Sequence, residues 1–121
     1  MHHHLFFLFF FVTTIDLSHG ALLCGVPAYC YYSTSGSVVG FEPLMTDEFI
    51  CSQACEANGN CAAFYVQKIV GYDGEDDSSG CYLLENSCTT SRLMPYATKI
   101  DIAPGGGSIV TSYKYWEQGC F

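Results

Sequence analysis

Residues 51–65 read Cys51-Ser-Gln-Ala-Cys55-Glu-Ala-Asn-Gly-Asn-Cys61-Ala-Ala-Phe-Tyr65, and the fold class follows from them. Cys51 and Cys55 are one helical turn apart, so both side chains project from the same face of a helix. Cys61 comes two residues after Gly59 and opens a run that is rich in β-forming residues. The segment therefore predicts a helix joined to a strand, with both helical sulfurs pointing inward.

The helix itself is predicted over Asp47–Asn58. Thr46 or Asp47 can cap its N-terminus, and Glu48 adds negative charge at the positive end of the helix dipole. Gly59 is predicted to end it. A helix of about three turns is marginal alone in water, so it needs a partner to pack against.

That partner is predicted to be a set of antiparallel strands. Each strand is marked by β-branched and aromatic residues, and the turns between them are rich in glycine, serine and acidic residues. The predicted elements are a strand, a turn at 34–37 and a strand within Ala21–Phe41, a hairpin of Cys61–Val70 and Cys81–Glu85 around the loop Gly71–Gly80, and a second hairpin within Ala97–Trp116 that turns at Pro104–Gly107.

Residues 1–20 have the features of a secretory signal peptide. Leu5–Val12 is an uncharged apolar run, and Ser18 and Gly20 are small residues at the positions that precede a cleavage site. The run is shorter than the roughly 20 apolar residues of a membrane span, although a retained membrane anchor is the alternative. We expect a secreted mature domain of residues 21–121 that is not inserted in a membrane.

The predicted mature chain is acidic and has no histidine. All four histidines and Asp16 lie in residues 1–20, so eleven of the twelve acidic residues remain against four basic ones, a net charge of −7. Nucleic acid is not an expected partner, because binding a phosphate backbone relies on clustered Lys and Arg. Catalysis by a Ser/His or Cys/His pair is excluded, and nothing places two carboxylates across a cleft. We expect neither an enzyme nor a cofactor.

Eight cysteines lie between Cys24 and Cys120. In a secreted domain such a density favours disulfides, although Cys51 and Cys55 could in principle share a zinc ion. The missing histidines and the export signal favour four disulfides over metal. Spacing alone leaves many pairings open.

The cysteine order resembles the PAN/apple domain family. The specific part of the resemblance is Cys51–Phe64 together with Cys81-Tyr-Leu83, and the rest of residues 21–121 matches by spacing. The resemblance implies an α+β fold in which one helix packs on a curved antiparallel β-sheet stabilised by disulfides. The long segment Met94–Ser112 and one extra cysteine pair depart from the family's minimal pattern.

The resemblance also implies a disulfide pairing. The shared core bridges of the family correspond to Cys51 with Cys81 and Cys55 with Cys61. Apple-type members tie their chain ends together, which here joins Cys24 to Cys120 and leaves Cys30 with Cys88. Exchanging the last two pairs, to Cys30 with Cys120 and Cys24 with Cys88, remains open.

As for function, PAN/apple domains generally bind protein or carbohydrate through loops and one sheet face. Aromatic side chains that combine area with a polar tip are candidate contacts, their alternative being a place in the core. Alternate carboxylates in the loop are candidate calcium ligands, against the alternative of a solvated loop that lacks the glycine and closing glutamate of an EF-hand. The candidates are Tyr72, Tyr113, Tyr115 and Trp116 for a ligand, and Asp73, Glu75 and Asp77 for calcium.

These observations lead to two hypotheses of function. The first is an extracellular recognition or adhesion module whose partner is a protein or a glycan. The second is a stand-alone secreted effector, such as an inhibitor or a toxin-like ligand, for which the disulfide scaffold provides durability.

Overall fold

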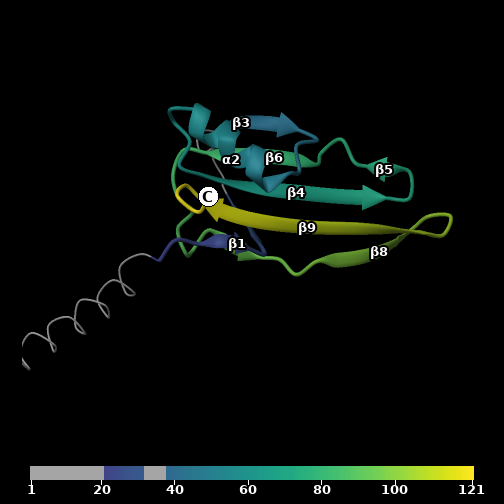
Figure 1. Cartoon of the computed structure of the whole chain (residues 1–121). Coiled ribbons are helices and arrows are strands. Elements are labelled where there is room, and N and C mark those ends of the chain that lie inside the picture. The colour runs from purple at the N-terminus through teal and green to yellow at the C-terminus, as the bar shows by residue number, and fades with distance from the viewer. Residues whose placement is uncertain (1–20, 32–37) are drawn as a thin grey trace, which may run out of the picture.

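The computed structural model describes residues 21–31 and 38–121. The predicted signal peptide and the predicted turn at 34–37 lie outside the described residues. Within them, one helix and an antiparallel sheet form the expected α+β arrangement, with α2 lying over one half of the sheet (Figure 1).

Helix α2 (Glu48–Ala57) closely matches the prediction. Of the two candidate caps, Asp47 is the one used, because its carboxylate accepts a hydrogen bond of 3.0 Å from the backbone N–H of Ile50. The C-cap is Asn58 rather than Gly59, and its side-chain oxygen accepts a hydrogen bond of 2.9 Å from the N–H of Asn60. An asparagine side chain therefore directs the chain out of the helix.

The main sheet is antiparallel throughout, in the order β1-β9-β4-β6-β3, with β5 added to β4 and β8 added to β9. A separate ribbon pairs β2 with β7, and β7 was not anticipated from the sequence. The strands are β1 (Cys24–Val26), β2 (Ala28–Cys30), β3 (Val38–Pro43), β4 (Ala63–Gly71), β5 (Gly74–Glu75), β6 (Gly80–Leu84), β7 (Leu93–Pro95), β8 (Lys99–Ala103) and β9 (Gly107–Glu117).

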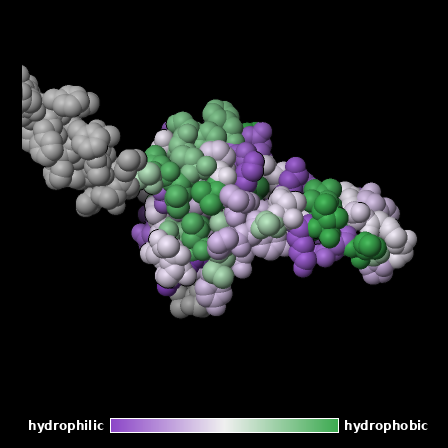
Figure 2. All heavy atoms as spheres, turned by 90° about the horizontal axis from the view of Figure 1, so that it is seen from below, coloured by the Kyte–Doolittle hydropathy of each residue, from purple (hydrophilic) through white to green (hydrophobic). Residues whose placement is uncertain are grey.

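The predicted second hairpin is present as β8 and β9. Its turn contains Gly105 and Gly106, whose φ angles of 93° and 100° suit glycine and few other residues. Together with the end of β4 and with β5, this hairpin forms an arm that extends beyond α2 (Figure 1). Seen from below, the arm is the narrower part of the molecule at the right (Figure 2).

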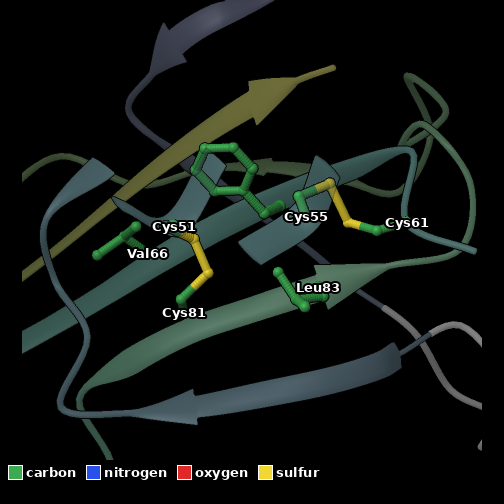
Figure 3. Packing of buried hydrophobic residues seen from close by; sticks show 7 residues of the cluster. Cys51, Cys55, Cys61, Val66, Cys81 and Leu83 are labelled. Atoms are coloured by element: carbon green, nitrogen blue, oxygen red, sulfur yellow. A yellow bond between two sulfur atoms is a disulfide. The ribbon is translucent and has the colours of Figure 1, made fainter. Parts of the chain in front are cut away.

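One face of the sheet packs against α2. Cys51 and Cys55 of the helix are at most 1% exposed and lie against side chains of β4 and β6. Figure 3 shows the two disulfides of this cluster lying beside Val66 and Leu83. Inward-facing sulfurs therefore fasten the helix to the sheet, as the spacing predicts.

The opposite face of the sheet has a core of its own. Alternate residues of β4 point to the two sides, so that Phe64 and Val66 face the helix while Ala63 and Tyr65 face away from it. The β2–β7 ribbon packs on this second side through Cys30. Each face of the sheet thus carries a buried cluster of its own.

Four disulfides join the eight cysteines and leave none free. Their Cα–Cα distances lie between 5.2 and 6.1 Å, within the range that disulfides require. The pairs are the ones that the family resemblance implies, without the exchange that was left open: Cys51–Cys81, Cys55–Cys61, Cys24–Cys120 and Cys30–Cys88. In residues 21–31 and 38–121, no helix has the length and apolarity to cross a membrane.

Candidate functional site

A row of aromatic side chains crosses the sheet on the face opposite α2. The strand register places Phe41, Tyr82, Tyr65 and Tyr115 directly across from one another on β3, β6, β4 and β9. The rings of Phe41 and Tyr82 are 4.6 Å apart, and those of Tyr82 and Tyr65 stack at 4.8 Å. Cross-strand pairing therefore assembles a row of aromatic side chains from residues far apart in the sequence.

The β2–β7 ribbon and the residues that follow its strands add further aromatic rings to this row. The ring of Tyr29 on β2 lies 4.9 Å from that of Tyr113 on β9, and Tyr96 meets Tyr113 edge-on at 4.8 Å. Tyr31 follows β2 and is 54% exposed. We call Tyr29, Tyr31, Tyr65, Tyr82 and Tyr113, together with Gln67, the tyrosine surface.

Hydrogen bonds fix the polar centre of the tyrosine surface. The Tyr113 hydroxyl donates to Oε1 of Gln67 at 2.6 Å, and Nε2 of Gln67 donates to the carbonyl oxygen of Ser78, also at 2.6 Å. Burial, helped by neighbouring Tyr96 and Tyr29, raises the pKa of Tyr113. The phenol therefore stays protonated and uncharged at neutral pH.

The tyrosine surface lines an open depression of about 380 Å³, and none of its described lining residues is charged at neutral pH. A second depression of about 540 Å³ shares Cys30 with it and is lined by polar side chains, among them Asn86, Thr89 and Arg92. Aromatic area beside a few hydrogen-bonding groups is the usual composition of a ligand site. The arrangement suits binding of a neutral ligand.

The four aromatic residues that the sequence singled out do not form one surface. Tyr113 belongs to the tyrosine surface, whereas Tyr72 is 83% exposed at the far end of β4. Tyr115 is 0% exposed and is therefore a core residue that no ligand can reach. Trp116 lies on the helix side, with its ring 4.7 Å from that of Phe121.

The acidic loop is exposed, and Asp73, Glu75 and Asp77 line a depression of about 330 Å³. Among residues 21–31 and 38–121, no three His, Cys, Asp or Glu side chains come together in a way that could hold a metal ion. Asp76 instead accepts hydrogen bonds from the side chain and backbone of Ser78, and these lower its pKa. The geometry offers no support for a calcium site.

Tyr65, Gln67 and Tyr82 of the tyrosine surface are not among the candidates predicted from the sequence. Tyr65 and Gln67 alternate with helix-facing residues of β4, so alternation within Cys61–Val70 could have placed them on one face. Tyr82 directly follows Cys81 and could have been assigned by the same argument. The partners across the sheet could not, because β9 pairs with β4 only in the folded chain.

Comparison of the chain with protein-family models, curated proteins and solved structures gives no match. The PAN/apple family therefore remains a prediction from the cysteine spacing.

Proposed function

We propose that this protein is a secreted recognition module that binds an extracellular protein or carbohydrate through the tyrosine surface. The observation that carries the proposal is the uncharged, tyrosine-lined depression on the sheet face opposite α2. Four disulfides fit an oxidising, extracellular setting.

Tyrosine suits this role because it provides a large, fairly rigid ring with a hydroxyl at its tip. Such rings lie against apolar patches of a protein or against the C–H faces of a sugar, while the hydroxyl and neighbouring amides form hydrogen bonds. Gln67 and Tyr113 are held by hydrogen bonds of 2.6 Å before any ligand arrives. This preorganisation lowers the entropic cost of binding.

The first test is a binding screen of the secreted protein against immobilised glycans and purified extracellular proteins. Any ligand found is then titrated against the Tyr31→Ala and Tyr82→Ala variants. We expect each to weaken binding by about tenfold, as truncation of a central aromatic contact does. Non-reducing peptide maps establish that both variants keep the four disulfides.

Tyr72→Ala is the matched control, because Tyr72 is the more exposed tyrosine and lies outside the tyrosine surface. The Tyr72→Ala variant should bind the ligand with the same affinity as the wild type. If Tyr31→Ala and Tyr82→Ala bind normally, the ligand uses another surface and the proposal fails. Inhibition of a protease or block of a receptor, without glycan binding, would favour the stand-alone effector.

A further inference from the structure

Strand β8 has an open edge. It pairs with β9 along one side, and no described strand pairs with its other side. In Figure 1 it forms the lower border of the arm. An open edge presents backbone N–H and C=O groups to which another strand can pair.

The side chains of β8 are divided between the two faces. Ile100 and Ile102 are 68% and 83% exposed. Ile100 lies across from Val110 of β9, which in turn lies across from Val70 of β4, so both isoleucines are on the α2 side of the sheet, beyond the end of the helix. Viewed from below, apolar atoms flanked by hydrophilic ones occupy this part of the arm (Figure 2). Such exposed isoleucines are a liability for an isolated edge strand.

Lys99 and Asp101 occupy the other face of β8. The Lys99 Nζ lies 3.9 Å from Oδ2 of Asp101, and both side chains are more than half exposed. The strand therefore presents one positive and one negative charge, two positions apart, on either side of Ile100.

We propose that β8 pairs with β8 of a second copy of this chain, antiparallel, about a two-fold axis at Ile100. In this register Lys99 lies opposite Asp101 of the second copy, and Asp101 opposite its Lys99, so both charge pairs are attractive. Ile100 meets its symmetry mate, and Ile102 lies diagonally across from Ile100 of the second copy, within reach of a long side chain. The interface is self-complementary, as a two-fold dimer requires.

The neighbouring registers are disfavoured by charge. A two-fold axis at Asp101 places the two aspartates opposite each other, and an axis at Lys99 does the same to the two lysines, which is repulsive. A register shifted by a single residue would place Ile100 across from Lys99 or Asp101. These side chains lie on the other face of the sheet, so no side-chain pairs would form across the interface. Charge complementarity thus selects the axis at Ile100.

A dimer of this kind would join the two main sheets edge to edge. Because antiparallel pairing preserves the two faces of a sheet, both tyrosine surfaces would lie on the same side. The inference does not depend on what the tyrosine surface binds. With only five residues in β8 the interface is small, so weak association is expected.

Site-directed crosslinking tests the register. The secreted protein carrying Ile100→Cys should form a disulfide-linked dimer under mild oxidation, because the two residues face each other across the axis. Ile102→Cys is the matched control: it is more exposed, but Thr98 of the second copy lies opposite it, so it should stay largely monomeric. Equal crosslinking of the two variants, or none, overturns the proposal, provided that peptide maps show the native bridges intact.

Charge reversal gives an independent test, in which sedimentation velocity measures the dimer dissociation constant. Asp101→Lys should raise the dimer dissociation constant about tenfold, and the double exchange Lys99→Asp/Asp101→Lys should restore it. Asp77→Lys, which changes the net charge equally in an exposed loop, should leave it unchanged. A wild-type protein that remains monomeric up to about 1 mM contradicts the proposal.

Discussion

Tyr115 illustrates how one side chain joins distant parts of the molecule. Its buried hydroxyl accepts a hydrogen bond of 2.7 Å from the backbone N–H of Cys88 and donates one of 3.1 Å to Glu117. Tyr115→Phe would keep the ring and leave the Cys88 N–H without its acceptor. We expect the free energy of unfolding to fall by about 1–3 kcal/mol, measured by denaturant titration. An unchanged value would mean that water replaces the hydroxyl.

Burial raises the pKa of Tyr115 to about 12, whereas a tyrosine in an unfolded chain titrates near 10. Between these values the folded state binds more protons than the unfolded state. The contribution to stability is therefore complete below about pH 10 and is lost as the pH rises to about 12, by up to roughly 2–3 kcal/mol. Denaturant titrations at a series of pH values should show a shallower decline for Tyr115→Phe. Parallel curves would refute the assignment.

At the scale of elements, Asp47 caps the N-terminus of α2. Asp47→Ala removes the acceptor for the Ile50 N–H and should lower the free energy of unfolding by about 1 kcal/mol. Thr46→Ala, at the neighbouring position that the sequence could not distinguish, should cost clearly less, because its hydroxyl makes only an exposed contact of 3.5 Å with Glu75. Thermal or denaturant unfolding of both variants decides which residue caps the helix.

At the scale of the whole molecule, the disulfide Cys24–Cys120 joins β1 to the segment that follows β9, across a sequence separation of 96 residues. Because the stabilisation grows with the size of the closed loop, the double variant Cys24→Ala/Cys120→Ala should lose about 4 kcal/mol of unfolding free energy. The backbone of Leu23 also hydrogen-bonds to Glu117, at 2.9 and 3.0 Å. A loss of unfolding free energy below about 1 kcal/mol would mean that the hydrogen bonds between Leu23 and Glu117 hold these two segments together without the disulfide.

The sequence determined the local elements. The four-residue spacing of Cys51 and Cys55 predicted α2, and the glycines after Pro104 predicted the turn between β8 and β9, because helix faces and turns depend on neighbouring residues. The eight cysteines predicted a disulfide-stabilised domain, and four bridges are present.

Only the tertiary structure decided how distant strands meet. Alternation along β9 puts Tyr113 and Tyr115 on one face of the sheet and Trp116 on the other, but both faces carry core residues, so alternation does not tell which of these side chains are buried. Nor does alternation show that the buried Tyr115 hydroxyl accepts a hydrogen bond from the Cys88 N–H, whereas the ring of Tyr113 packs against that of Tyr29. Those contacts follow from pairing β9 with β4 and packing the β2–β7 ribbon on the sheet. Long-range burial, which no local pattern encodes, therefore made one tyrosine a core residue and the other part of a candidate site.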